Sequence, residues 1–338
     1  MKVSLAALCL TIHSAAAFAP ASSISKPVCA LKSSTDNDVD NTWAADLSSD
    51  TSLSPASNSE EHMNIFPVEP TWETVQGGKT VKTYKMPQWA NRGQYFMKTN
   101  GRPLDAMAQL WIGPLRNVHT MQVNNQNGAL TPFKATMSFK KLAPTLKIST
   151  SEHLELPVVV GILVPKPENA EKLLANTEKL WNAAGPEAKQ LIQGGSTMGG
   201  GGAIRSWDIP DNVGEVQMMV WSRDVGKKSF RTKIEVLQGP NNRIQSYALQ
   251  CGGGSQPYHC VIQTPGPGWI VRIQNQKFVE DGLHEFLVMP YTPGSSSIPP
   301  PIPEKGSVDP SSGSGGRGSS TFKPLFDDKT DFNTRWHN

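Results

Sequence analysis

The sequence contains a long stretch that occurs twice, and this duplication restricts the possible folds more than any other feature. Val81–Pro87 reads VKTYKMP, and Ile204–Pro210 reads IRSWDIP 123 residues later. Five of these seven positions keep their chemical type, the proline is identical, and Lys85 against Asp208 reverses the charge. Further matches follow at offsets of 125 or 126 residues: Gly113-Pro114 with Gly239-Pro240, Pro132-Phe133 with Pro257-Tyr258, Leu146–Ile148 with Val271–Ile273, and Ile162–Pro165 with Leu287–Pro290. A nearly constant offset over such a length predicts a tandem duplication.

Both copies consist of short runs that are typical of β-strands. In the first copy these runs predict strands at 80–86, 94–99, 104–112, 118–123, 132–139, 145–149 and 158–164. In the second copy, 230–236 alternates apolar residues with Arg231, Lys233 and Glu235. Period-two alternation with one polar face indicates an antiparallel sheet with one buried side. The dipeptides Asn100-Gly101 and Asn127-Gly128 favour hairpin turns.

A helix is predicted between the copies. Pro167 and Glu168 begin it, apolar residues follow at helical spacing to Trp181, and Gly185-Pro186 ends it. A second short helix is expected at 187–193, followed by a glycine-rich run. The predicted fold class is therefore α+β and β-rich, with two tandem β-sheet pseudo-repeats related by an approximate twofold, a helical linker and disordered termini. The length of 338 residues leaves room for two ordinary domains, each with its own core.

The first 63 residues have the composition of a targeting leader. Residues 1–17 combine Lys2, a short apolar run and an alanine-rich cleavage site, which predicts a signal peptide and no transmembrane segment. Residues 18–35 are rich in serine and free of acids, as in a plastid transit peptide. Residues 36–63 are expected to be a disordered acidic segment. The alternative interpretation is plain secretion. Two of the four cysteines, Cys9 and Cys29, fall in the leader, so no disulfide framework is predicted.

The remaining boundaries follow from the repeats and from composition. Two β-rich repeats are expected at 64–166 and 203–290, joined by a helical and glycine-rich linker at 167–202. A Pro/Gly/Ser-rich tether without a core is expected at 291–320. The chain then ends in an aromatic C-terminal peptide, 321–338. Its expected assembly residues are Phe322, Phe326, Phe332 and Trp336. The alternative is that this peptide folds back onto its own domain.

Charge is unevenly distributed along the chain. Residues 76–290 hold 24 Lys and Arg against 15 Asp and Glu, whereas 30–75 holds one Lys against nine acids. The expected folded part is therefore basic and the leader acidic. This charge distribution bears on which partners the protein binds, not on its fold. Acidic protein surfaces are as suitable a partner as nucleic acid. No nucleic-acid partner is predicted, because the aromatic residues match each other between the copies and suit core or interface positions.

No combination of residues predicts an enzyme or a cofactor. The glycine run 194–202 lacks the Lys-Ser ending of a phosphate-binding loop and leads into a strand. Cys260 beside His259, with Cys251 nearby, could form a metal or thiol pair, but small buried cysteines at strand ends are the more common case. The histidines show no spacing typical of metal ligands. We therefore predict no catalytic residue, no cofactor and no metal.

With the leader, the two copies and the tail in view, the chain resembles the diatom pyrenoid shell proteins. The resemblance covers the duplicated core, about 79–291, and extends to the aromatic C-terminal peptide. It rests on the arrangement of the chain and on the matched pairs that contain Tyr84–Pro87, Gly113-Pro114 and Pro132-Phe133. It implies a structural, non-enzymatic protein of the plastid stroma at the pyrenoid periphery. Such proteins assemble side by side into a thin sheet around the Rubisco matrix and help to retain CO2.

The expected function is thus a self-assembling shell subunit whose partner is itself, with Rubisco as a further partner on one face. The alternative from another class is a stromal adaptor or scaffold that binds a photosynthetic complex without forming a lattice. An enzyme of the stroma is the third and weakest hypothesis.

Overall fold

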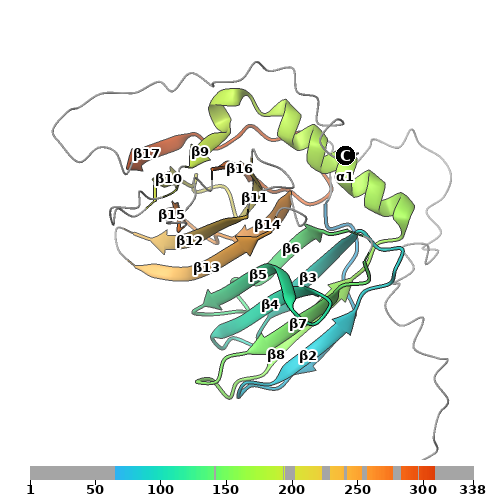
Figure 1. Ribbon diagram of the computed structural model, residues 1–338. Helices are drawn as coiled ribbons and strands as arrows, with labels where there is room; N and C mark the ends of the chain where they lie inside the picture. Colours follow the sequence, from blue (N-terminus) through green and yellow to red (C-terminus); the bar gives the residue numbers. More distant parts are fainter. Residues whose placement is uncertain are drawn as a thin grey trace, which may run out of the picture. The chain divides into compact units, whose positions relative to one another are not determined.

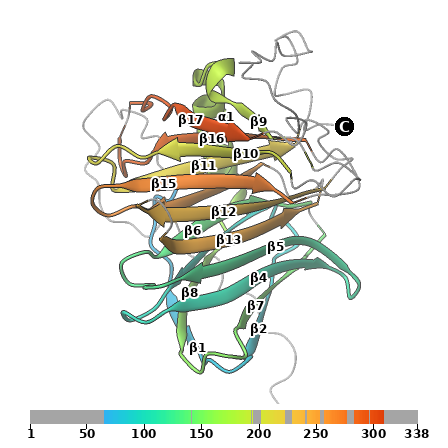
Figure 2. The ribbon, with the colours of Figure 1, turned by 90° about the vertical axis from the view of Figure 1, so that its left-hand side faces the viewer.

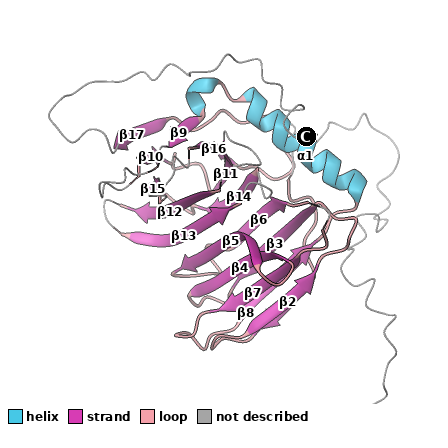
Figure 3. Cartoon of the chain, in the orientation of Figure 1, coloured by secondary structure: helices cyan, strands magenta, loops and turns pink. Residues whose placement is uncertain are grey.

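The computed structural model describes residues 65–308, except 141, 193, 195–201, 223–228, 240–241, 253–256, 277–282 and 296. The chain divides into two compact units at Asp40/Asn41, and all described residues belong to the second unit. This part is β-rich with one long helix (Figure 3). The predicted leader and aromatic C-terminal peptide lie outside the described residues.

Each copy contributes seven strands at matching positions. In the first copy they are β2 (Val81–Lys85), β3 (Arg92–Lys98), β4 (Leu104–Ile112), β5 (Arg116–Asn125), β6 (Phe133–Ser138), β7 (Thr145–Thr150) and β8 (Val158–Leu163). In the second they are β10 (Ile204–Asp208), β11 (Glu215–Ser222), β12 (Phe230–Gln238), β13 (Arg243–Cys251), β14 (Tyr258–Gln263), β15 (Trp269–Asn275) and β16 (His284–Pro290). Three short strands join them: β1 (Trp72–Val75), β9 (Gln190–Ile192) and β17 (Glu304–Val308). All seven strands predicted in the first copy are confirmed, with ends that differ by one or two residues.

The strands form two antiparallel sheets, and both sheets run through both copies. The order in the eight-stranded sheet is β1-β8-β3-β6-β14-β11-β16-β9. The order in the nine-stranded sheet, which faces the reader in Figure 2, is β17-β10-β15-β12-β13-β5-β4-β7-β2. The copies meet where β6 pairs with β14 and where β5 pairs with β13. The predicted fold class is confirmed as β-rich.

Strand order is the same in the two copies. In each sheet, the strands of the two copies follow the same order toward the junction between the copies. In the eight-stranded sheet, for example, β8-β3-β6 matches β16-β11-β14. At the junctions, Gln122 pairs with Ala248 and Ala135 pairs with Cys260, which are matched positions 126 and 125 residues apart. These are the orders and registers that an approximate twofold between the copies requires. The twofold itself remains a prediction, which superposition of the two copies would test.

Matching irregularities occur at the same place in each copy. The β4–β5 pair shifts register between Leu110 and Trp111, and β12–β13 shifts between Val236 and Leu237, 126 residues later. Gly113 and Gly239 follow these bulges with φ of 63° and 78°, a region in which glycine avoids a side-chain clash. Among the described residues, the hairpins β4–β5 and β12–β13 of the nine-stranded sheet therefore turn at Gly113 and Gly239.

The core lies between the sheets and is shared by the two copies. One continuous cluster includes Tyr84, Tyr95 and Phe133 from the first copy and Trp207 and Phe286 from the second, all almost fully buried. The inward side chains come from alternate residues of each strand, as in β4, where buried and half-buried positions alternate. The length would allow two separate cores, but the pairing of β5 with β13 and of β6 with β14 merges them into one.

Helix α1 (Pro167–Ala183) covers the outer face of the eight-stranded sheet (Figure 1). The first backbone N–H groups of a helix have no bonding partner within it, and Pro167 at the start of α1 has no backbone N–H. Leu180 and Trp181 pack with Phe96 and Trp221 of the sheet, and Ile65, which precedes β1, joins the same cluster. The predicted helix is confirmed. No helix in the described part of the chain combines the length and apolar content needed to cross a membrane.

Three local predictions are wrong. Asn100-Gly101 and Asn127-Gly128 do not form hairpins, because β3 and β6 belong to one sheet and β4 and β5 to the other. The short helix expected at 187–193 is a single 3₁₀ turn at Pro186–Ala188 followed by β9, which pairs with β16. In both cases the partner strand, distant in sequence, overrides the local preference.

The predicted tether 291–320 is also wrong in its first half. Tyr291 and Ile302 are buried, and β17 pairs with the outer edge of β10. An exposed edge offers unpaired backbone groups, so even a segment that contains Gly306 can pair there. The part of the tether beyond Val308 lies outside the described residues.

Candidate interaction surfaces

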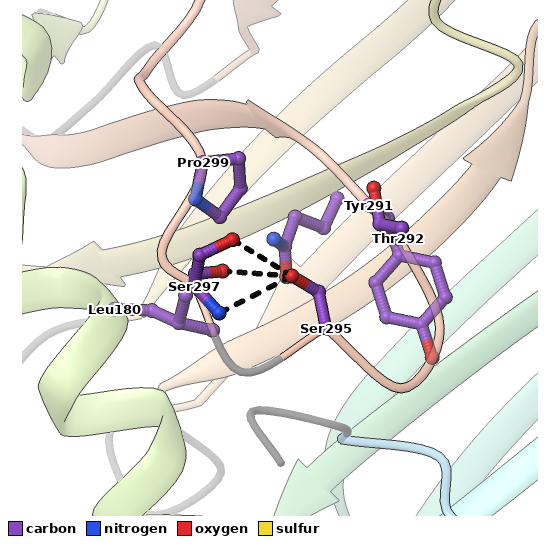
Figure 4. Close-up of a pocket in the computed structure, with 7 residues that line it drawn as sticks. Leu180, Tyr291, Thr292, Ser295, Ser297 and Pro299 are labelled. Carbon is purple, nitrogen blue, oxygen red and sulfur yellow. Dashed lines mark hydrogen bonds between the residues drawn. The ribbon is translucent and has the colours of Figure 1, made fainter. Parts of the chain in front are cut away.

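The structure offers little room for a small-molecule substrate at the pocket that Figure 4 shows. This pocket lies between α1 and the segment after β16 and is lined by Leu180, Tyr291 and Ser297, among others. Ser295 Oγ is hydrogen-bonded with Ser297 across it, 2.9 Å from Ser297 Oγ. The cavity volume is about 10 Å³, which suits one water molecule. In the described residues, no group of three or more His, Cys, Asp or Glu is arranged to hold a metal.

A metal or thiol pair formed by Cys260 and His259, the less favoured of the two alternatives from the sequence, is excluded by geometry. Neighbouring residues of a strand point to opposite faces of the sheet. Cys260 accordingly packs in the shared core, whereas the ring of His259 lies 6.4 Å from that of Phe66 on the outer face. Burial raises the pKa of the Cys260 thiol, which makes it a poor nucleophile.

A buried polar network lies instead at the junction of the copies. Tyr95 Oη is 2.8 Å from Tyr258 Oη and 3.2 Å from His119 Nε2, and His119 Nδ1 is 3.3 Å from Cys251 Sγ. The residues come from β3, β14, β5 and β13, so both sheets and both copies contribute. Sequence analysis missed this network because its contacts join residues up to 163 positions apart.

The electrostatics of this network favour a structural role. All four side chains are buried. Burial lowers the pKa of His119 to about 3, so the imidazole is neutral at physiological pH. Burial also raises the pKa values of Tyr95 and Tyr258. A catalytic Cys–His pair needs an accessible thiol and a polarising environment. The network therefore fixes the packing of the two copies and has the chemistry of a satisfied core.

The buried histidines predict that the protein loses stability in mild acid. Burial lowers the pKa of His259 to about 3, as it does for His119, and the nearby Arg92 adds to the effect. Below about pH 6.5 the unfolded chain binds protons that the folded chain excludes, so the free energy of unfolding falls as pH falls. Each histidine contributes about 1.4 kcal/mol per pH unit, so we expect a loss of about 3 kcal/mol between pH 7.5 and 5.5.

Urea denaturation at the two pH values measures this loss. His259→Gln should remove about half of the pH dependence, whereas His153→Gln, at an exposed position, should leave it unchanged. Equal unfolding midpoints at pH 7.5 and 5.5 would contradict the prediction.

The outer face of the nine-stranded sheet is exposed and basic on the second copy. Glu235 lies among Lys233, Arg243 and Arg272, with Lys233 Nζ 2.6 Å and Arg272 Nε 2.9 Å from its carboxylate oxygens. Burial acts to raise the pKa of Glu235, but the hydrogen bonds and charges of Lys233 and Arg272 outweigh it and lower the pKa to about 2. Three cations around one carboxylate leave an excess of positive charge, which suits an acidic protein surface.

The two ends of the nine-stranded sheet differ. At one end β17 covers β10, with Arg205 Nε 3.6 Å from a Glu304 carboxylate oxygen and an ion pair between Lys305 and Asp208. At the other end β2 pairs with β7, and no described strand pairs with its second edge. The predicted assembly residues Phe322, Phe326, Phe332 and Trp336 lie outside the described residues, so the structure does not place them.

Comparison with known proteins gives one specific match. The family model described as "Diatom pyrenoid shell protein" matches residues 67–290. A search of curated proteins finds no match. Among solved structures, the crystal structure of Lactobacillus farciminis oxalate decarboxylase with formate is 10% identical. That alignment covers 64% of this chain and 86% of the other, with a TM-score of 0.14. At so low a TM-score it carries no argument about fold or function. The family match spans both copies and both sheets.

Proposed function

Because the chain belongs to the diatom pyrenoid shell protein family, we propose that it self-assembles into a thin protein shell around the Rubisco-rich pyrenoid of the plastid. The shell would support CO2 concentration and fixation, and the protein would lie in the stroma at the pyrenoid periphery. The family is a structural one, which implies that the protein is not an enzyme. The observation that carries the proposal is the match over 67–290, which includes both copies.

The architecture supports assembly. Two matched copies joined through continuous sheets present similar surfaces at two places on one protomer. Contacts between such surfaces and a second molecule can repeat without closing into a ring, and contacts that do not close propagate into sheets or tubes. Free strand edges, which most proteins protect, offer a means of contact.

Negative-stain microscopy of purified residues 64–338 tests the proposal. We expect extended sheets or tubes above a critical concentration. Monodisperse particles at every salt and protein concentration would overturn the shell and favour an adaptor that binds a photosynthetic complex without a lattice. Rubisco added to preformed sheets tests the second partner, and binding to one face is the expected result.

We also propose that the C-terminal peptide 321–338 staples neighbouring subunits through Phe322, Phe326, Phe332 and Trp336. Buried aromatic side chains dominate interface energetics. A tethered second contact gains effective concentration and so strengthens a lattice without enlarging its main interface. The competing idea is that the same peptide binds Rubisco.

Assembly should depend on salt because the folded part is basic. Exposed charges are screened beyond about 10 Å at 0.1 M ionic strength. We expect the critical concentration for assembly to change by about threefold or more between 50 and 500 mM NaCl. Light scattering across a dilution series measures it. An unchanged critical concentration would mean that apolar contacts alone drive assembly.

A further inference from the structure

The strand order of the nine-stranded sheet has one asymmetry. Without β17 the order would match from both ends, β10-β15-β12-β13 against β2-β7-β4-β5. β17 pairs antiparallel with the outer edge of β10, from Ile204 opposite Val308 to Trp207 opposite Glu304. The matched position beside β2 has no strand in the described part of the chain. The first copy therefore presents the edge that the second copy uses to bind a strand.

The backbone of β2 is arranged to accept such a strand. Thr80 O accepts a hydrogen bond from Thr150 N at 3.0 Å, and Met86 N donates to Pro144 O at 2.8 Å. Bonded pairs alternate along an antiparallel ladder, so the even-numbered residues of β2 bond to β7. The N–H and C=O groups of Val81, Thr83 and Lys85 therefore point to the other edge. These three residues are also exposed.

Apolar side chains are exposed in β2 and in the two loops that adjoin its C-terminal end. Val81 is 49% exposed, Trp89 in the loop after β2 is 37% exposed, and Leu142 in the loop before β7 is 56% exposed. The matched positions of the second copy are Ile204, which pairs with β17, and the residues Asn212 and Pro267. Exposed apolar side chains next to an open strand edge mark a protein-binding site more than a solvated surface.

The charges at the edge define the partner. Lys82 and Lys85 lie in β2, and Lys82 forms an ion pair with Glu73 of β1. Lys85 is the position at which the second copy carries the opposite charge, Asp208. In the second copy Asp208 pairs with Lys305 of β17. A β17-like strand on β2 would bring Lys305 against Lys85, and like charges opposite each other destabilise a sheet. An edge lysine commonly prevents sheet-to-sheet pairing, and here Lys85 favours an acidic side chain on the added strand.

We propose that the open edge of β2 binds the C-terminal peptide of a neighbouring copy as an added strand. This inference rests on the proposed self-assembly and identifies its receptor site. The peptide carries three acids and three cations, and its adjacent acids Asp327 and Asp328 would meet Lys85. Phe322 and Phe326 would cover Trp89 and Leu142. Strand addition combines backbone hydrogen bonds, which give affinity, with side-chain contacts, which give specificity.

The length of the connection favours a neighbouring copy over the same chain. Eight strand spacings separate β17 from β2, which is roughly 38 Å at about 4.8 Å each. The connection Asp309–Ser320 has 12 residues and a root-mean-square span of about 19 Å if flexible. The peptide would have to stretch to about twice this span to reach its own β2. A neighbour whose β2 end lies beside the β17 end is within ordinary reach, and this head-to-tail contact repeats indefinitely.

Photo-cross-linking of the full chain identifies the occupant. Thr83→p-benzoylphenylalanine is prepared in unlabelled and ¹⁵N-labelled chains, which are mixed before assembly and irradiation. We expect cross-links from position 83 to 322–332, carrying both isotopes and therefore joining different chains. Cross-links within one chain, cross-links to β2 or β17 of a second copy, or none to 322–332 would each overturn the proposal.

A proline variant tests the hydrogen bonds independently. Thr83→Pro removes one outward N–H and none of the bonds to β7, and proline is tolerated at a strand edge. We expect its critical concentration for assembly to rise about tenfold or more, while Thr83→Ala, which keeps the N–H, stays within about twofold of the natural chain. Circular dichroism confirms folding of both. If Thr83→Pro assembles normally, the inference is wrong but the shell function stands. If the natural chain itself does not assemble, the proposed function fails.

Discussion

Replacing Tyr258 with alanine is expected to lower the free energy of unfolding by about 4 kcal/mol, and to do so for both copies at once. Tyr258 is fully buried in the second copy, its hydroxyl is 2.8 Å from that of Tyr95 in the first, and its ring lies 5.1 Å from His119. Truncation leaves a cavity at the junction and removes a partner from the buried network. Because one core spans the two copies, neither copy can lose its packing alone.

Urea denaturation followed by tryptophan fluorescence and by circular dichroism measures this effect. Coincident transitions, shifted together by the substitution, are the expected result. Tyr258→Phe is the matched control, because it keeps the ring and removes only the hydroxyl, and should cost about 1 kcal/mol. Two separate transitions, with only one shifted by Tyr258→Ala, would mean that the copies are independent domains.

Deletion of 321–338 is expected to weaken or disorder assemblies of the pure protein. Loss of a tethered second contact reduces the effective concentration of the partner surface, and we expect the critical concentration to rise about tenfold or more. Negative-stain microscopy and sedimentation measure assembly of the natural chain and of the shortened chain. A full-length variant controls for the change in chain length. It keeps residues 321–338 but has serine in place of the four aromatic residues Phe322, Phe326, Phe332 and Trp336.

The same deletion separates the two roles proposed for the peptide. If the shortened chain forms normal sheets but no longer associates with Rubisco, the peptide binds that partner and the staple is wrong. The structure already changes one premise of the staple. β17 fixes residues 304–308, so a connection to the peptide can begin no earlier than Asp309 and is shorter than the tether expected from composition.

Local sequence was sufficient where the structure depends on local patterns. The strands of both copies have alternating or continuous apolar residues, and helix α1 has Pro167 at its start and apolar residues at helical spacing. The turns at Gly113 and Gly239 were not predicted, although the matching Gly-Pro dipeptides were part of the evidence for the duplication. The family resemblance, which rested on matched pairs of short segments, is confirmed over 67–290.

Contacts between distant residues could not be predicted in this way. The Asn-Gly dipeptides have the chemistry of hairpins, yet they connect strands of different sheets. Residues 190–192 and 304–308 have weak strand patterns, and they become strands because the edges of β16 and β10 offer unpaired backbone groups. Cys251 and His119 are 132 residues apart and are brought together only by the pairing of β13 with β5.

The sequence by itself determined the duplication, the strand positions, the helix and the family, because each is carried by residues close together in the chain or by similarity between two segments. Only the tertiary structure decided that the copies share one core. It also decided that β17 pairs with the outer edge of β10, whereas no described strand pairs with the outer edge of β2. Those features depend on which strand lies beside which. Pairing energy between strands comes from side chains and backbone groups far apart in sequence, so no local pattern records it. The asymmetry of one added strand, and the binding edge it implies, became visible only when the two sheets were complete.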